Sequence, residues 1–354
     1  MIAIHHREGS FSDKWIEYCD IHHVEYKLVN CYDSDIISQL EDCDALMWHW
    51  PQTDFKAQQF ARQLIYALEM KGLSVFPDSN TCWHYDDKVG QKYLLESIQA
   101  EIPETTVFYD SRSAYRWIAK NDFPKVFKLR GGAGSSNVHL IRTLDQAKQY
   151  ISKAFSQGFS SVSRVGLLTE RVWHAKRDKN IKSILSIWRG LARLFIPTEL
   201  EKQSAKEQGY IYFQEFIPKN NFDIRVIVIG KRAFGIKRMV RANDFRASGS
   251  GSIIFDPDQI SPVCVKLAFE YTHRINAQSV AYDFIFKNGL PLLVEISYAF
   301  LHNVYRECPG YWDENLKWVA GKFYSEWFNV EDMLNSIKDK NKQIIYHHEN
   351  SDPS

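Results

Sequence analysis

Short apolar runs and stretches of helical periodicity alternate through the N-terminal part of the chain. Four apolar runs predict strands, at residues 2–6, 24–29, 44–50 and 73–77. Two stretches between them place apolar side chains at helical spacing, residues 11–23 and 53–72. Alternating strands and helices are typical of an open α/β layer with a mostly parallel sheet. The pattern therefore predicts an N-terminal α/β domain over residues 1–82.

A second region mixes strands and helices less regularly. Helical patterns cover two stretches, residues 86–98 and 113–120, and strand patterns cover three, residues 105–110, 125–129 and 138–142. Residues 165–209 form an insertion in which Lys and Arg outnumber Asp and Glu. An amphipathic helix pair that covers a lobe and a basic lid over an anionic ligand both fit this composition. We predict a lobe over residues 83–212 that carries the insertion.

The C-terminal region is predicted to be rich in antiparallel hairpins. Its strand patterns cover residues 210–218, 223–230, 233–240, 279–286 and 290–297. Turn sequences such as Lys287-Asn288-Gly289 separate successive strands. We predict a C-terminal lobe over residues 213–335, followed by a polar tail at 336–354 that frays.

The composition is that of a soluble globular protein. The chain is 45% hydrophobic and 25% charged, with a net charge of +1, so it has no overall attraction to nucleic acid. No apolar run approaches the length of a membrane span. Six scattered cysteines without a C-x-x-C pair fit a reducing compartment and argue against a zinc site or a disulfide framework. We therefore expect a cytoplasmic protein.

Residues 127–141, FKLRGGAGSSNVHLI, place glycines and serines between two apolar runs. Glycine permits positive φ, and successive backbone N–H groups form a concavity that binds anions such as phosphate. The loop is not a Walker A motif, because no lysine follows its last glycine. It also lacks the third glycine of the dinucleotide fingerprint, where Asn137 stands. A solvated turn fits the loop alone equally well, so the neighbouring motifs decide.

Asp283 and Glu295 are carboxylates within otherwise apolar strands. A buried carboxylate is unfavourable unless it is paired or binds a metal, and two beside a phosphate loop would supply oxygen ligands to Mg²⁺. A strict two-residue turn at Asn288-Gly289 pairs residue 283 with residue 294 and places the carboxylates on opposite faces. If they share a metal, the hairpin must contain a bulge or a longer loop. The alternative is two acids that face solvent at a sheet edge.

The strand over residues 223–230 also combines charge with apolar alternation. Asp223 and Arg225 share one of its faces. Further cations follow closely, Lys237, Arg238, Arg241 and Arg246. One buried ion pair accounts for one acid and one arginine, so the additional cations suggest a polyanionic ligand.

In their order along residues 80–315, these motifs resemble those of ATP-grasp enzymes, in particular the RimK-like branch of carboxylate–amine ligases. The resemblance implies an ATP-grasp fold of the α/β class, with α+β lobes behind the N-terminal open α/β domain. It also implies the cofactors ATP and Mg²⁺, with Mn²⁺ as an alternative metal. Lys88 of the DDK motif and Lys128 would reach the phosphates. The loop would close over them through Gly132, Gly134, Ser135 and Ser136.

The same resemblance assigns the remaining motifs. FQEFIP resembles the hinge between the ATP-binding lobes, so Glu215 and Phe216 would meet the adenine. The nucleotide site would also include Asp223 and Ser248. The pattern D…E-I-S resembles the metal triad of the family, and the implied metal ligands are Asp283, Glu295 and Ser297. The implied catalytic residues, which neutralise phosphate, substrate carboxylate or oxyanion charge, are Arg225, Arg246 and Lys237.

Three features depart from the family pattern. Ser297 replaces the asparagine of the metal triad, and Asn137 replaces the final loop glycine, a position where asparagine tolerates the left-handed region best among other residues. Residues 298–313 differ from the usual ending and resemble ATP-grasp proteins of bacterial surface-polysaccharide pathways. In this segment, either an acceptor pocket or simple packing would explain His302, Arg306 and Tyr311.

The implied reaction is amide formation through an acyl phosphate made from ATP. The partners would be a small-molecule or saccharide carboxylate and an amine, without nucleic acid or a membrane span, and a homodimer is an open alternative. Two other functions remain: an ATP-grasp phosphotransferase that acts on a hydroxyl, and a non-catalytic nucleotide-binding protein.

Overall fold

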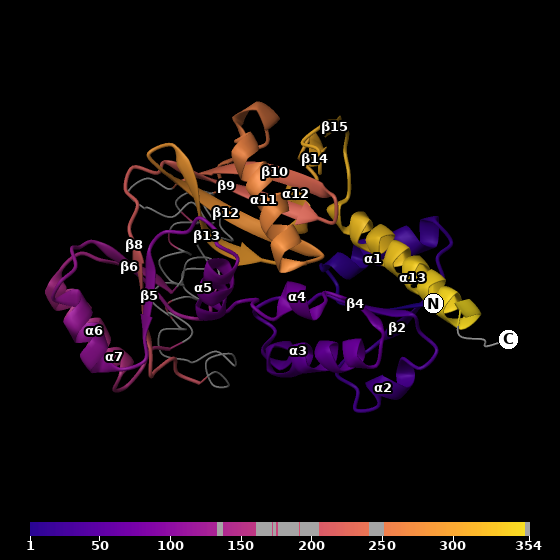
Figure 1. Ribbon diagram of the computed structural model, residues 1–354, viewed down its shortest axis with the longest axis horizontal. Helices are drawn as coiled ribbons and strands as arrows, with labels where there is room; N and C mark the ends of the chain where they lie inside the picture. Colours follow the sequence, from indigo (N-terminus) through magenta and orange to yellow (C-terminus); the bar gives the residue numbers. More distant parts are fainter. Residues whose placement is uncertain are drawn as a thin grey trace.

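The computed structural model describes residues 1–132, 137–160, 205–240 and 251–350, together with residues 172, 175 and 191; for 341 and 343–350 it describes only the backbone. Three β-sheets and their covering helices make up this part of the chain (Figure 1). Parallel and antiparallel sheets occur together with helices, which confirms the predicted α/β class.

The N-terminal sheet is parallel, with the strand order β2-β1-β3-β4. Its elements are β1 (Ile2–His5), α1 (Phe11–Ile21), β2 (Tyr26–Val29), α2 (Ile36–Gln39), β3 (Ala45–Trp48), α3 (Phe55–Met70), β4 (Ser74–Phe76) and α4 (Ser79–Cys82). The central strands β1 and β3 are buried along their whole length, which explains their continuous apolar sequences. The chain moves from β1 outward to β2 and then returns to β3 on the other side. β1 and β3 therefore flank the topological switch point of this sheet.

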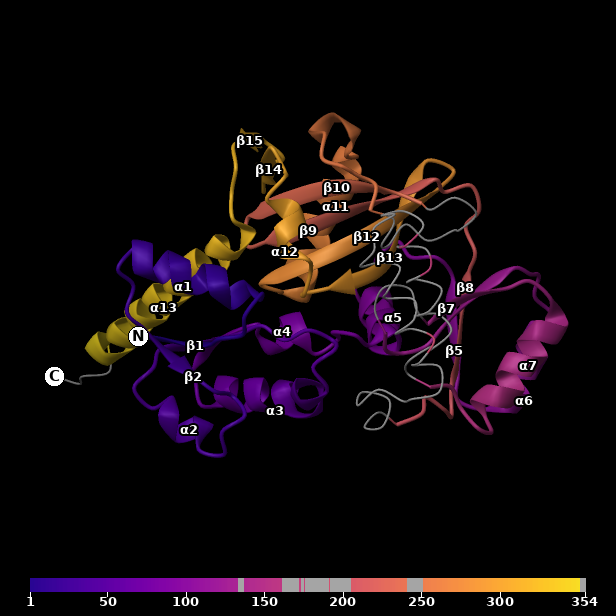
Figure 2. The same ribbon diagram turned by 180° about the vertical axis from the view of Figure 1, so that it is seen from behind.

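A second, antiparallel sheet has the order β5-β8-β6-β7. Its strands and the neighbouring helices are α5 (Lys88–Ser97), β5 (Thr105–Phe108), α6 (Ser111–Ile118), β6 (Lys125–Lys128), β7 (Val138–Ile141), α7 (Leu144–Ala154) and β8 (Ile211–Glu215). Apolar residues of α6 and α7 pack on this sheet as one core cluster. Helix α5 lies between this lobe and the third sheet in both views (Figures 1 and 2), and Leu95 of α5 joins the core of that third sheet.

The third sheet is the largest and has the order β13-β12-β9-β10-β14-β15, with β11 paired to β10. Its strands are β9 (Phe222–Ile229), β10 (Arg232–Met239), β11 (Ile253–Ile254), β12 (Ser279–Lys287), β13 (Leu290–Ser297), β14 (Gly310–Asp313) and β15 (Trp318–Ala320). The helices of this region are η1 (Pro257–Gln259), α11 (Pro262–Ile275), α12 (His302–Tyr305) and α13 (Ser325–Asn350). The pairing between its neighbouring strands is antiparallel throughout, as the hairpin pattern predicts.

The two faces of the large sheet have different roles. One face, with Ile224, Val226 and Phe284, packs against α11. The other face carries Ile227 and Ile229, which pack against the N-terminal domain and α13. Further along the same strands, this second face changes from apolar to charged side chains. The functional candidates therefore lie on a continuation of a core surface, which holds them rigidly.

The chain end corrects one expectation. Residues 336–350, which the sequence predicted as a polar tail, belong to α13, which continues to Asn350. The helix runs beside α1 in both views (Figures 1 and 2), and Val330 and Met333 are buried with Trp15 of α1. The sequence hid this helix because polar residues outnumber its spaced apolar contacts. Across the described residues, no helix combines the length and apolar character that a membrane span requires.

Candidate active site

A cleft lies between the four-stranded antiparallel sheet and the large sheet. Its apolar lining comes from both lobes, including Val126, Val138, Phe216, Ile217, Phe222 and Ile285. Its charged lining consists of Lys128, Glu215, Asp223, Arg238, Asp283 and Glu295. An apolar slot that continues into fixed charges can bind a flat ring attached to an anionic chain.

Glu215 and Phe216, the residues expected near adenine, both line the cleft. The Glu215 carboxylate accepts a hydrogen bond from Lys287 at 2.6 Å, and its backbone N–H donates to the Glu104 carbonyl at 2.8 Å. Both groups of Glu215 thus have partners within the protein. Glu215 therefore mainly anchors the end of β8, while the ring of Phe216 contributes apolar surface to the cleft.

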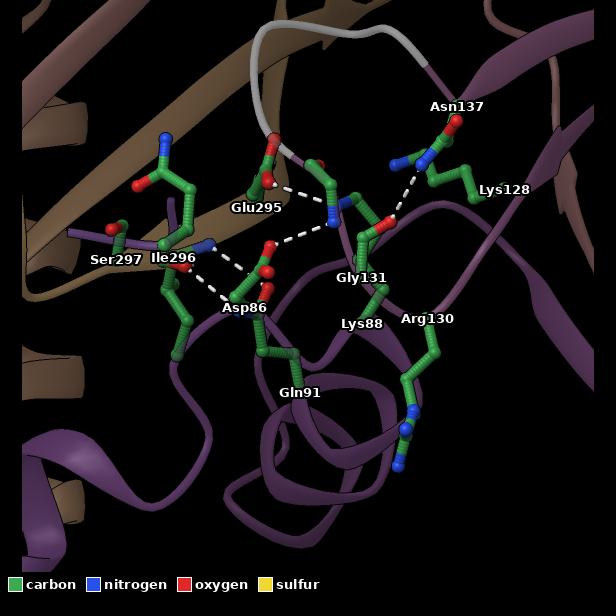
Figure 3. Close-up of polar contacts among 12 residues, drawn as sticks. Asp86, Lys88, Gln91, Lys128, Arg130, Gly131, Asn137, Glu295, Ile296 and Ser297 are labelled. Carbon is green, nitrogen blue, oxygen red and sulfur yellow. Dashed lines mark hydrogen bonds and ion pairs between the residues drawn. The ribbon is translucent and has the colours of Figure 1, made fainter. Parts of the chain in front are cut away.

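Lys88 is the first residue of α5 and is 5% exposed. Its Nζ donates to the Gly132 carbonyl at 2.8 Å and lies 3.4 Å from Glu295 Oε1 (Figure 3). Burial alone would lower the pKa of Lys88, but Glu295 and Asp86 outweigh this effect, so its pKa is raised. Lys88 is therefore a fixed cation that joins the start of the glycine loop to a predicted metal ligand.

Asp86 is a site residue that the sequence did not single out. Its Oδ1 accepts the Gly132 N–H at 2.8 Å, and its backbone adopts a φ of 54° in the left-handed region. Burial raises the pKa of Asp86, and the nearby Lys88 charge opposes this shift. In the sequence, Asp86 resembles an ordinary acidic residue ahead of a helix. Its strained backbone and its bond to Gly132 show that it holds the glycine loop.

Lys128, at the end of β6, is buried without a strong partner. Its Nζ donates to the Val294 carbonyl at 3.2 Å. Burial, together with the Lys88 charge, lowers the pKa of Lys128 to about 8, although Glu295 and Asp283 oppose the shift. Among the described residues, no carboxylate lies within ion-pair distance of this amine. An anionic ligand would supply a negatively charged partner for the Lys128 amine.

In the described part of the glycine loop, Asn137 does not have the left-handed backbone expected of a residue that replaces a glycine. Gly132 has a φ of +112°, whereas Asn137 is not among the residues with positive φ. Asn137 instead donates from Nδ2 to the Gly131 carbonyl at 3.2 Å (Figure 3). A Cβ at Gly132 would lie 2.4 Å from that Nδ2, so glycine is required there. Asn137 therefore ties the two sides of the loop together and does not replace a left-handed glycine.

The predicted bulge in the hairpin of Asp283 and Glu295 is confirmed. Asp283 pairs with Glu295, and the register shifts before Phe284 pairs with Leu293. Val294 is thus the extra residue of a β-bulge, and its carbonyl is the one that accepts from Lys128. The bulge places both carboxylates on one face of the sheet and also provides a partner for the lysine.

Asp283 is held by two arginines. Arg225 donates to it from Nε at 2.5 Å and from Nη2 at 2.6 Å, and Arg238 Nη2 lies 2.9 Å away. Arg238 also forms two hydrogen bonds with Asp223, at 2.7 and 2.6 Å. Burial would raise the pKa of Asp283, but Arg225 and Arg238 outweigh it and lower the pKa. Two acids and two arginines thus neutralise each other, so these cations do not require a polyanion.

The predicted metal ligands lie together but are unequally available. The Glu295 side chain is 38% exposed, and its ion-pair partner among the described residues is the Lys88 amine. Ser297 donates its hydroxyl hydrogen to the Ala299 carbonyl at 2.7 Å, which leaves its oxygen lone pairs as acceptors. Among the residues with described positions, no group of three His, Cys, Asp or Glu side chains is arranged to hold a metal ion. To bind an ion together with Glu295 and Ser297, Asp283 would have to give up a contact with Arg225 or Arg238.

The placement expected for Lys237 is wrong. Lys237 pairs with Ile224, on the face of the sheet that packs against α11, and its Nζ donates to Gln259 at 3.2 Å. Arg238, one residue further, pairs with Asp223 and faces the cleft. The period of two along a strand would have selected Arg238 once the register with Asp223 was known.

Several predicted residues lie outside the part of the chain that the structure describes: Gly134, Ser135, Ser136, Arg246 and Ser248. Most of the basic insertion at residues 165–209 lies there as well. Of the three residues noted in the atypical ending, Tyr311 is partly buried and packs on Phe234, Phe323 and Phe328 at the edge of the core. His302 and Arg306 instead face the buried Glu326.

Comparison with known proteins identifies the class of the fold. The RimK domain ATP-grasp protein from Sphaerobacter thermophilus matches with a TM-score of 0.55 at 16% identity, covering 94% of this chain and 99% of that one. The D-alanine–D-alanine ligase of Bacillus anthracis, in complex with ATP, gives 0.55 at 12% identity, with coverages of 96% and 97%. The biotin carboxylase domain of Hydrogenobacter thermophilus 2-oxoglutarate carboxylase, with MgADP, gives 0.56 at 12% identity, with coverages of 93% and 68%. The chain has an ATP-grasp fold.

The sequence comparison is more specific. Residues 175–301 match the model of the RimK-like ATP-grasp domain, which confirms the predicted resemblance. No curated protein matches the sequence.

Proposed function

We propose that this protein is an ATP- and Mg²⁺-dependent ligase that joins a carboxylate to an amine. One observation carries the proposal. Lys88, Lys128, Asp283 and Glu295 come from α5, β6, β12 and β13 and meet at a cleft between two antiparallel sheets. The ATP-grasp fold and the RimK-like match over residues 175–301 support the same interpretation.

The cleft fits a nucleotide. Its apolar side chains suit an adenine ring, and its lysines suit the phosphates. Lys128 is the most informative group, because burial lowers its pKa and no acid among the described residues forms an ion pair with it. Phosphate oxygens would stabilise its charged form through charge-assisted hydrogen bonds. The Lys88 amine donates a hydrogen bond to the Gly132 carbonyl. It would give up this hydrogen bond in order to donate to the phosphates.

The metal site fits Mg²⁺ through oxygen ligands. Glu295 and the Ser297 hydroxyl would hold the ion, with Asp283 contributing if it gives up a contact with Arg225 or Arg238. When bound, the ion would offset the charge that develops on the phosphates. Ser297 would serve in place of the asparagine that the family pattern leads one to expect.

The reaction that we propose has two steps. A carboxylate oxygen of the acid attacks the γ-phosphorus of ATP, the bond to the β-phosphate oxygen breaks, and ADP leaves. The amine nitrogen then attacks the acyl carbon of the acyl phosphate, loses a proton and displaces phosphate. Lys88 and Lys128 would hold the phosphates in line for the first step, and most of the acceleration would come from this positioning and charge neutralisation.

The test is ADP release from purified protein with Mg-ATP, given pooled carboxylates and pooled amines separately and together. We expect release that needs both pools and is absent in the Glu295→Gln variant, which leaves the ion pairs of Asp283 with Arg225 and Arg238 intact. Binding of Mg-AMPPNP is measured in parallel. Release with a hydroxyl compound and no amine would instead indicate the phosphotransferase. Nucleotide binding without release under any condition would support the non-catalytic alternative.

The same assay tests the predicted link to surface polysaccharides. The link to surface polysaccharides depends on residues 298–313 alone, so uronic acids and amino sugars belong in the two pools. Cytoplasmic location and a homodimer likewise stay predictions.

A further inference from the structure

The strand that carries Glu295 and Ser297 lies at the edge of the large sheet. Among the described strands, β13 pairs with β12 alone. The backbone groups on its other side need different partners, because a buried N–H or C=O without a hydrogen bond is unfavourable. The contacts along this open side therefore decide how firmly the two predicted metal ligands are fixed.

The side-chain amide of Gln91, on α5, takes the place of a neighbouring strand at this edge. Its Oε1 accepts the Ile296 N–H at 3.3 Å, and its Nε2 donates to the Ile296 carbonyl at 2.9 Å (Figure 3). One amide thus reproduces the two bonds that a paired residue on an antiparallel strand would make. Ile296 stands between Glu295 and Ser297 and is 1% exposed, so the contact holds the buried backbone that joins the two ligands.

A second side chain bonds the same edge on the other side of Glu295. The Val294 carbonyl accepts from Lys128 Nζ at 3.2 Å. Phosphate would compete for this charged amine when a nucleotide binds. The Gln91 amide carries no charge, so it would keep its bonds to the strand in the nucleotide complex.

Gln91 also joins β13 to the segments that hold the phosphate lysine and the glycine loop. Its Nε2 donates to the His84 carbonyl at 3.1 Å, two residues before Asp86, which holds the loop. Lys88 precedes Gln91 by three residues on α5, so the two side chains are neighbours on one face of the helix. This side chain therefore connects the helix of Lys88, the segment of Asp86 and the strand of Glu295.

The Gln91 amide has a full set of partners and faces the protein. The side chain is 4% exposed, and its three bonds engage the oxygen and both hydrogens of Nε2. All three bonds go to backbone groups, and Gln91 is not among the residues that line the cleft. Any influence of Gln91 on the site must therefore act through the residues that it holds in place.

We propose that Gln91 is a positioning residue for the metal site, because its bonds to Ile296 set the place of Glu295 and Ser297 relative to Lys88. This proposal rests on the proposed ligase function and adds a residue that touches neither nucleotide nor ion. Without these bonds the ligands would remain but would be held less precisely. Loss of a contact that orients metal ligands typically weakens metal affinity about tenfold to a hundredfold.

The test compares Gln91→Met with Gln278→Met in the full chain. Gln278 is the matched control, since its side chain also accepts a backbone N–H, from Asp78 at 2.8 Å, and donates to a backbone carbonyl, of Val75 at 2.8 Å. These bonds join the N-terminal domain to the start of β12, outside the residues that line the cleft. Both variants replace an amide with an unbranched apolar side chain of similar length.

Two binding measurements read the metal site without turnover. Calorimetry gives AMPPNP affinity as a function of Mg²⁺ concentration, and electron paramagnetic resonance gives Mn²⁺ affinity with AMPPNP present. We expect Gln91→Met to need about tenfold to a hundredfold more Mg²⁺ and to bind Mn²⁺ more weakly by a similar factor. Gln278→Met should match the wild type in both, although urea denaturation should show a similar loss of stability in the two variants.

A milder variant keeps the test decisive if Gln91→Met folds poorly. Gln91→Asn retains the amide but is one carbon shorter, so it should not reach Ile296 and should also raise the Mg²⁺ requirement.

The outcomes separate this inference from the ligase proposal. Absent Mg-AMPPNP binding by the wild type would overturn the ligase proposal and the inference with it. If the wild type binds Mg-AMPPNP, the inference alone is overturned when the folded Gln91 variants need no more Mg²⁺ than the wild type. It is also overturned when Gln278→Met raises the Mg²⁺ requirement equally, since the effect would then come from a general loss of stability.

Discussion

Two charged clusters lie on the same side of the large sheet and differ in how completely they are paired. The first contains Asp223, Arg225, Arg238 and Asp283, and each of its charges has a partner at 2.9 Å or less. The second contains Asp86, Lys88, Lys128 and Glu295. Among the described residues, its shortest ion-pair distance is 3.4 Å, and Lys128 donates to a backbone carbonyl instead of an acid. The charges of the first cluster thus balance one another at short distance, whereas those of the second cluster are only loosely paired among the described residues.

The difference separates charges that hold the fold together from charges that we propose bind the phosphates of ATP. A fully paired buried network holds strands in register, and removal of one member leaves a buried charge uncompensated. A loosely paired cluster keeps cations ready for an anion at the cost of stability, which is the arrangement expected of a phosphate site.

Asp283→Asn should have the largest effect, because it removes the acid shared by Arg225 and Arg238. We expect the free energy of unfolding to fall by about 3–5 kcal/mol, the range for breaking a buried ion pair. Urea denaturation measures this change, with Asp258→Asn on the exposed η1 turn as the control. A loss below about 1 kcal/mol would show that the network is not structural.

Lys128→Met should separate stability from binding. This variant removes a buried charge that forms no ion pair within the described part of the chain, so the free energy of unfolding should change by less than about 1 kcal/mol or rise. Mg-ATP affinity should fall about tenfold to a hundredfold, because a charge-assisted bond to phosphate is lost. Calorimetry and denaturation measure the two quantities, and Lys125→Met on the same strand is the control. Unaltered affinity would remove Lys128 from the nucleotide site.

The pH dependence of nucleotide binding should follow Lys128. Its pKa of about 8 lies below its ordinary value of 10.5, and phosphate binds the charged form. Mg-ATP affinity should therefore fall about tenfold per pH unit above 8, with proton uptake on binding. The unfolded chain binds more protons between pH 8 and 10.5, so the stability cost of this lysine should disappear as the pH rises through that window. Lys128→Met should abolish both trends, and a wild-type affinity that stays flat to pH 9.5 would contradict the assignment.

Lys287→Gln should have the smallest effect. The Lys287–Glu215 pair is partly exposed, with side-chain accessibilities of 47% and 27%, and such pairs contribute about 0.2–1 kcal/mol. Thermal unfolding at low and high salt measures this contribution. A larger loss of stability, or a loss that persists at high salt, would show that the Lys287–Glu215 pair stabilises the fold as the first cluster does.

The sequence predicted the elements better than their contacts. Periodicity located most strands of the three sheets but missed β11, β14 and β15. A metal shared by Asp283 and Glu295 called for a bulge or a longer loop in their hairpin, and the structure contains a bulge there. Periodicity did not select Arg238 over Lys237, because the choice depends on the cross-strand register with Asp223.

Two other features depend on contacts between distant segments. Asp86 has its role only because the glycine loop returns to it through Gly132, 46 residues later. The C-terminal helix is stabilised by burial of Val330 and Met333 against α1, which no local pattern reveals.

The packing of α13 on α1 constrains the order of folding during synthesis. Trp15 and Tyr18 leave the ribosome early, but their covering residues Phe328, Val330 and Met333 are made some three hundred residues later. Until then the nascent N-terminal domain exposes an aromatic surface to other proteins. Domains commonly fold in order as they emerge, and such exposed surface invites aggregation. This protein should therefore depend on chaperone protection late into translation, and slowing its last codons should lower its soluble yield.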